Sequence, residues 1–81
     1  FVIAEERYTT AIQLAEDAGD EEALAAAQAG LGRTYGDSDE TAKAIEQLEQ
    51  ARAGYEELGE ATRAAELVGL IVTLTPPTPA P

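Results

Sequence analysis

The chain has 81 residues, enough for one small domain, and contains neither cysteine nor histidine. Its net charge of -11 repels nucleic acid and anionic membranes, excludes both as partners and favours cationic ones. Without histidine or cysteine the usual pairings of nucleophile and base are missing, so we predict no catalytic residue, no metal and no cofactor. No stretch approaches the roughly 20 apolar residues of a membrane span, and no signal-peptide pattern is visible. We therefore expect a cytoplasmic protein.

The apolar residues recur at spacings of three and four and predict four helices. The first covers residues 2–18 and ends at Gly19, which supplies a left-handed residue. The second begins after its cap, Asp20, and ends near Gly36. The inner stripes of these two helices are Ala4, Tyr8, Ala11 and Ala15, followed by Leu24, Leu31 and Tyr35.

The third helix is predicted over residues 40–58, with Ser38 or Asp39 as its cap and Gly59 at its end. The fourth covers about residues 60–74 and becomes steadily more apolar. Proline cannot continue a helix, so residues 76–81 form a tail or linker after a helical domain of residues 1–75. The inner stripe of the third helix is Ala44, Leu48, Ala51, Tyr55 and Leu58.

The sequence also matches itself after a shift of 40 residues. The identical pairs are Ala4 with Ala44, Glu6 with Glu46, Ala11 with Ala51, Glu16 with Glu56, Gly19 with Gly59 and Ala25 with Ala65. The first helix is therefore equivalent to the third, and the second to the fourth. A simple four-helix bundle does not require such a repeat, whereas a stacked array of helical hairpins does.

These residues resemble the tetratricopeptide repeat (TPR) family, in a long-helix variety. Leu31-Gly32 followed by Tyr35 matches the Leu-Gly-x-x-Tyr of the family's first helix. The matches to its second helix are Ala44, Leu48 and Ala51. The repeat of about 40 residues is longer than the usual 34 or so. The resemblance implies an all-α array of four antiparallel helices, with one complete repeat flanked by two half repeats.

The resemblance further implies a protein-protein interaction module with a concave groove, lined mainly by the first helix of each hairpin. Arg33 is the only cation among the groove positions, so a clamp for a carboxylate is disfavoured. A basic or apolar segment of a protein or peptide is the better candidate partner. The predicted lining residues are Ala26, Ala29, Gly30, Arg33, Glu66, Gly69 and Thr73.

Both end helices would lack a hairpin mate. Since Phe1 stands inside the first helix, we expect a fragment of a larger bacterial regulatory or adaptor protein whose other segments cover these faces. The bacterial source is suggested by an alanine-rich composition in which arginine outnumbers lysine. One alternative is a fold-back of the last apolar turns as a cap. The other is a homodimer formed through Val68, Ile71, Val72 and Leu74.

The spacing of three glycines, Gly30, Gly32 and Gly36, resembles a dinucleotide-binding loop. That loop needs a strand before it, and here an alanine-rich helix precedes it. We interpret Gly32 as a position where a neighbouring helix comes close and Gly36 as the end of the helix. The pattern assigns no packing role to Gly30, which either marks the close approach of a ligand or has no function.

A last alternative concerns the short acidic segment around Ser38. Acyl carrier proteins are small, acidic and four-helical, and carry a phosphopantetheine on a serine at the start of a helix. Ser38 stands near the matching place, although Asp39 replaces the leucine expected after it. The same segment resembles the opening of a calcium loop, but the later ligand positions are not acidic, which favours helix capping.

Overall fold

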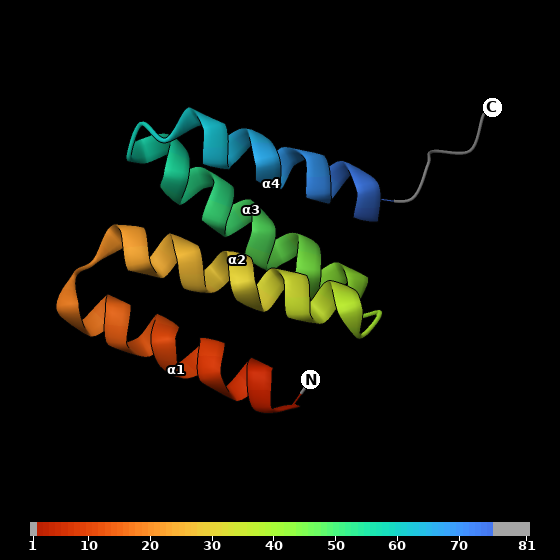
Figure 1. Cartoon of the computed structure of the whole chain (residues 1–81), viewed down its shortest axis with the longest axis horizontal. Coiled ribbons are helices and arrows are strands. Elements are labelled where there is room, and N and C mark those ends of the chain that lie inside the picture. Colours follow the sequence, from red (N-terminus) through yellow and green to blue (C-terminus); the bar gives the residue numbers. More distant parts are fainter. Residues whose placement is uncertain (1, 76–81) are drawn as a thin grey trace.

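The computed structural model describes residues 2–75, and these form four α-helices joined by short turns (Figure 1). Their bounds are Val2–Ala18 for α1, Glu21–Asp37 for α2, Thr41–Glu57 for α3 and Ala61–Leu74 for α4. The predicted all-α class is confirmed, since residues 2–75 contain no strand. The predicted tail at 76–81 lies outside the described residues.

The helices form an open array in chain order. Each runs antiparallel to the one before it and lies beside it, as Figure 1 shows from red α1 to blue α4. The main contacts join α1 to α2, α2 to α3 and α3 to α4. A closed bundle would also pack its first helix against its last. The arrangement is therefore the stacked hairpin array that the 40-residue repeat predicts.

The turns between the four helices share one geometry. Gly19 and Gly59 adopt the predicted left-handed conformation, with φ of 68° and 76°, and Asp39 does the same with φ of 62°. The residue after each of them donates its backbone N–H to the carbonyl five residues earlier, at 2.9 Å in all three turns. This bond closes the end of each helix and fixes the direction of the next.

The predicted cap of the third helix is wrong. Glu40 is the N-cap of α3, while Ser38 belongs to the end of α2 and Asp39 to the turn. The turn needs a left-handed residue at its centre, and aspartate is one of the few side chains that adopts this conformation. Gly36 consequently stays inside α2, which continues to Asp37. The predicted cap at Asp20 is confirmed, because its carboxylate accepts the N–H of Ala23 at 3.0 Å.

The core lies between α2, α3 and α4. It is built from alanines around three larger residues, Leu48, Tyr55 and Leu67, which are almost fully buried. Leu58 was predicted in the inner stripe but is 37% exposed, because α3 ends before it. The core residues are Ala25, Ala29, Leu48, Ala51, Tyr55, Ala64 and Leu67.

Two glycines let the neighbours of α2 approach closely. A Cβ on Gly32 would lie 2.7 Å from Cγ of Leu48 in α3, so the predicted close contact is present. A Cβ on Gly30 would overlap the ring of Tyr8 in α1. Gly30 therefore has a packing role that was not predicted, on the opposite neighbour of α2.

Candidate functional site

A groove runs between α2 and α4, with α3 as its floor. One hollow in it, of about 230 Å³, is lined by Ala26, Ala29, Arg33, Tyr55, Arg63, Glu66 and Leu67. A second, of about 310 Å³, is lined by Arg33, Gly36, Asp37, Leu48, Leu70, Thr73 and Leu74. Arg33 belongs to both, so the two hollows form successive parts of one groove.

Most of the residues predicted for the groove do line it: Ala26, Ala29, Arg33, Glu66 and Thr73. Gly30 does not, because α1 covers that side of α2 and the ring of Tyr8 lies against it. Gly69 does not either, and a Cβ placed on it would meet nothing within 4 Å. Gly30 and Gly69 therefore lie outside the two hollows, and the binding role of the other five positions stays a prediction.

Three residues that line the first hollow were not predicted for the groove. Tyr55 was assigned to the inner stripe of the third helix, and Leu67 belongs to the apolar fourth helix; each is buried yet borders the hollow. Arg63 comes from the first turn of α4 and was given no role. Its side chain reaches the hollow because the first turn of α4 lies beside Tyr55, near the end of α3, which is a feature of the helix packing and not of any local motif.

The two arginines of the groove differ in their surroundings. Arg63 lies 3.4 Å from Glu60 and 3.5 Å from Glu22, and its guanidinium is 5.6 Å from the ring centre of Tyr55. The charge of Glu60 is the main reason why the pKa of Arg63 is raised above its ordinary value. Arg33 forms no ion pair with any residue in 2–75. The cation left to meet a ligand is therefore Arg33.

The geometry of hairpins, turns and groove agrees with the comparison to known families. The tetratricopeptide repeat model matches residues 1–57, which cover α1, α2 and α3. The chain belongs to the tetratricopeptide repeat family. No curated protein and no solved structure matches it. TPR domains generally mediate protein-protein interaction and are typically non-catalytic scaffolds.

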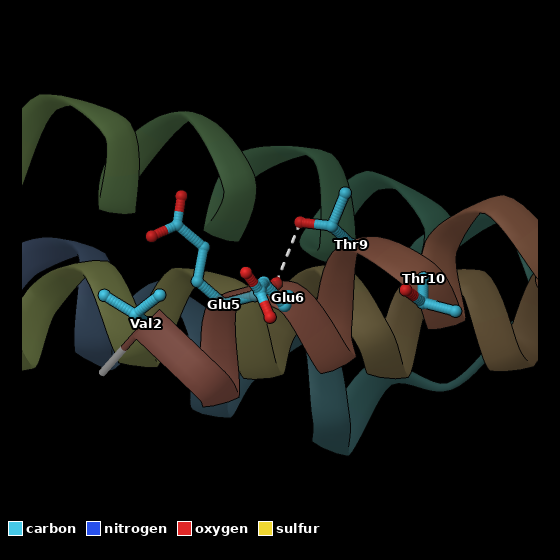
Figure 2. A pocket seen from close by; sticks show the side chains of 5 residues that line it. All are labelled: Val2, Glu5, Glu6, Thr9 and Thr10. Carbon is cyan, nitrogen blue, oxygen red and sulfur yellow. Dashed lines mark hydrogen bonds between the residues drawn. The ribbon is translucent and has the colours of Figure 1, made fainter.

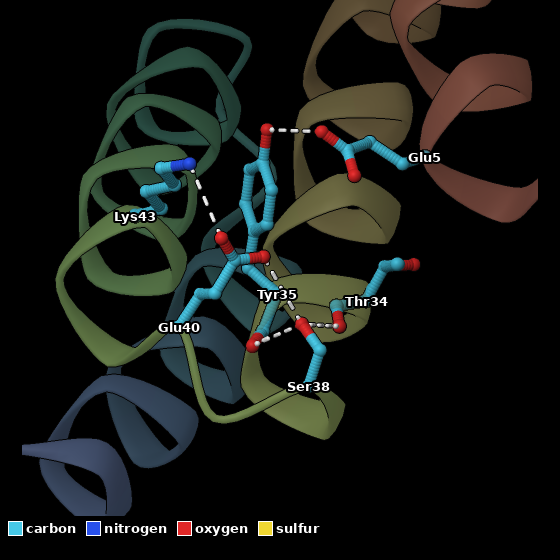
Figure 3. A network of polar contacts seen from close by, with 6 residues as sticks. All are labelled: Glu5, Thr34, Tyr35, Ser38, Glu40 and Lys43. Carbon is cyan, nitrogen blue, oxygen red and sulfur yellow. Dashed lines mark hydrogen bonds and ion pairs between the residues drawn. The ribbon is translucent and has the colours of Figure 1, made fainter. Parts of the chain in front are cut away.

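A polar network ties three helices of the TPR array together outside the groove (Figure 3). The hydroxyl of Tyr35 donates to the carboxylate of Glu5 at 3.2 Å, and the Lys43 ammonium lies 5.6 Å from the Tyr35 ring centre. Partial burial, followed by the bond to Glu5, raises the pKa of Tyr35. Lys43 also pairs with Glu40 at 3.1 Å. The network joins α1 to the α2–α3 hairpin and has a structural role.

Ser38 belongs to the same network, at the end of α2. Its hydroxyl lies within hydrogen-bonding distance of the carbonyls of Thr34 and Tyr35 and of the Glu40 carboxylate. The acyl-carrier hypothesis placed this serine at the start of a helix, and that placement is wrong. Within residues 2–75, no cluster of three or more acidic side chains could hold a metal ion.

An open hollow on α1 does not form a site. Its lining residues all come from this one helix: Val2, Glu5, Glu6, Thr9 and Thr10. Figure 2 shows these side chains spread along the helix surface, and the Thr9 hydroxyl donates to the helix's own backbone, at Glu5. Groups that stand side by side on one helix cannot surround a ligand.

The four residues predicted for self-association divide into two pairs. Val68 and Val72 of α4 are 43% and 66% exposed. Ile71 and Leu74 instead are partly buried against the core of the same chain, and Leu74 lines the second hollow of the groove. Although α4 is strongly apolar, none of the described helices is long and apolar enough to span a membrane.

Proposed function

We propose that residues 1–75 form a non-catalytic binding module within a larger bacterial regulatory or adaptor protein. The module binds an apolar segment of a partner protein, flanked by basic residues, in the α2–α4 groove. The observation that carries this proposal is the groove itself, in which buried Tyr55 and Leu67 border a hollow between two helices. Family membership supports a protein as the partner.

The size of the groove supports a peptide segment. Enclosed sites for small molecules are usually about 300–1,000 Å³ and cover most of the ligand. The two hollows here are about 230 and 310 Å³ and lie side by side along the helices. Each can take one or two side chains of an extended or helical segment, while the rest of that segment stays in solvent.

The charges support basic residues in that segment. The chain carries a net charge of -11, and Glu66 and Asp37 line the groove. Arg63 already has two carboxylate partners, so it adds little net positive charge. Basic residues beside the apolar anchor would be attracted, and salt would weaken the attraction because it screens exposed charges.

The proposal is tested by selecting binders from a random peptide library and measuring their affinity by fluorescence anisotropy. Ala26 is exposed in the groove, so Ala26→Arg places a bulky cation there without disturbing the core. We expect this variant to weaken binding at least about tenfold. The matched control is Ala42→Arg, at an exposed position of α3 outside the groove, which should leave affinity unchanged. Selected peptides that are acidic, or an equal loss in both variants, would contradict the proposal.

A second candidate is self-association through α4. The observation that favours it is the exposure of Val68 and Val72 on one side of this helix. Sedimentation of the purified chain tests it, because association must increase with concentration. A strict monomer over a wide concentration range would remove this candidate and leave the groove proposal intact.

A further inference from the structure

We propose that copies of this chain associate head to tail, with α4 of one copy packed against α1 of the next. This inference rests on the self-association candidate above and names its second surface. The contact would repeat the α2–α3 interface, so the array would continue from copy to copy. Two exposed apolar faces, one on each end helix, lead to it.

The outer face of α4 corresponds to the face of α2 that touches α3. In that interface Ala25 lies against Gly54, and Gly32 lies against Leu48. A shift of 40 residues takes Ala25 to Ala65 and Gly32 to Val72. Gln28 forms a hydrogen bond with Gln50 at 3.1 Å, and its equivalent in α4 is Val68. All three equivalents, Ala65, Val68 and Val72, are exposed.

The outer face of α1 corresponds to the face of α3 that touches α2. The equivalents of Leu48, Gln50 and Gly54 are Tyr8, Thr10 and Leu14. Leu14 is 64% exposed although it is a large apolar residue. Ile3, exposed at 67%, is likewise equivalent to Lys43, which stands over the ring of Tyr35. Thus α1 presents the surface that a helix like α2 or α4 normally covers.

The outer faces of α4 and α1 therefore correspond to the two sides of the α2–α3 interface. We expect Val72 against Tyr8, Val68 against Thr10 and Ala65 against Leu14 of the next copy. In two of these three pairs, a larger side chain stands where the α2–α3 interface has a glycine: Leu14 in place of Gly54 and Val72 in place of Gly32. The helix axes must consequently lie farther apart than those of α2 and α3, since side-chain size sets the spacing of packed helices.

The charge distribution allows this contact. The exposed α4 positions Ala65, Val68 and Val72 carry no charge, although the whole chain has a net charge of -11. The electrostatic repulsion between copies comes from their other surfaces. Added salt screens this repulsion and should therefore strengthen the association. Each copy has one α4 face and one α1 face, which makes the contact heterologous and able to extend beyond a dimer.

Two single variants separate this arrangement from a symmetric dimer. Val72→Arg blocks the α4 face and Leu14→Arg blocks the α1 face, and both positions are well exposed. Arginine lowers the net negative charge, so lost association cannot be due to added repulsion. Val68→Arg serves as a second block of the α4 face, and Val2→Arg, exposed on α1 but outside the proposed face, is the control.

Sedimentation velocity should show wild-type and Val2→Arg species that grow beyond a dimer as concentration rises. Each blocking variant alone should form no chain of copies. An equimolar mixture of Val72→Arg and Leu14→Arg should form a heterodimer and nothing larger, because one intact face of each kind remains. If Leu14→Arg alone dimerises while Val72→Arg stays monomeric, the contact is α4 against α4 and the head-to-tail arrangement is wrong. A monomeric wild type would overturn self-association altogether, whatever the groove binds.

Discussion

Helices α2 and α4 occupy equivalent places in the repeat, yet their surroundings differ. α2 is packed between α1 and α3 and buries seven residues, whereas α4 is packed mainly on α3 and buries Ala64 and Leu67. α4 is nevertheless the more apolar sequence. Burial in this array thus depends on how many neighbours a helix has, and not on how apolar it is.

The contrast is sharpest at one pair of equivalent positions. Gly32 has no side chain because Leu48 fills the space above it, while its equivalent Val72 is 66% exposed. In the α2–α3 hairpin the side chains therefore allow close contact between the helices, whereas the outer face of α4 carries a larger side chain at the equivalent position. Substitutions at equivalent positions should reveal this difference in stability.

The largest expected effect compares Leu48 with its equivalent, Tyr8. Leu48 is 0% exposed and Tyr8 is 36% exposed. Leu48→Ala leaves a cavity in the core and should lower the free energy of unfolding by about 3 kcal/mol. Tyr8→Ala should cost about 1 kcal/mol, since much of that ring already touches water. Urea denaturation measures both values, and similar losses would show that α1 packs as tightly as α3.

A smaller effect, of opposite sign in the two helices, is expected for glycine-to-alanine substitutions. At Gly32 the new Cβ would lie 2.7 Å from Leu48, so Gly32→Ala should destabilise the fold by about 1–3 kcal/mol. At Gly69 the Cβ would meet nothing within 4 Å. Gly69→Ala should therefore stabilise the fold by about 0.5–1 kcal/mol through helix propensity. Thermal unfolding of the two variants checks the signs, and a destabilised Gly69→Ala would contradict the open environment of α4.

The smallest effect concerns the turn between α2 and α3. Asp39 has φ of 62°, where the equivalent turns have Gly19 and Gly59. Asp39→Gly should raise the free energy of unfolding by about 0.5 kcal/mol, because glycine adopts this conformation without strain. The reverse change, Gly59→Asp, is the control and should lower it. Chemical denaturation of both variants measures these changes. A lower free energy of unfolding for Asp39→Gly would mean that the aspartate side chain stabilises the turn.

The helices were predictable because local residues determine them. α1 has the predicted bounds, and Gly19 and Gly59 end their helices as expected. The α2–α3 turn was mispredicted because its central residue is not glycine. Rules of local sequence place Ser38 or Asp39 as a cap, while the hydrogen bond from Glu40 to Tyr35 assigns that position to Glu40.

The groove was predictable only in part, because its lining depends on distant contacts. The register of the repeat assigned Arg33 and Glu66 to the groove, and both line its first hollow. It could not show that Tyr8 covers Gly30, since these residues are far apart in the chain and no motif links them. The position of Arg63 beside Tyr55 likewise follows from the way α4 packs on α3.

The central claim is that one complete hairpin stands between two half repeats that are held on one side only. Native-state hydrogen exchange by NMR tests it most directly, at a concentration where the chain is monomeric. We expect the slowest exchange in α2 and α3, with α1 and α4 opening at lower free energy because each has one main neighbour. Equal protection of all four helices would contradict the account, since it would mean one cooperative bundle instead of an array.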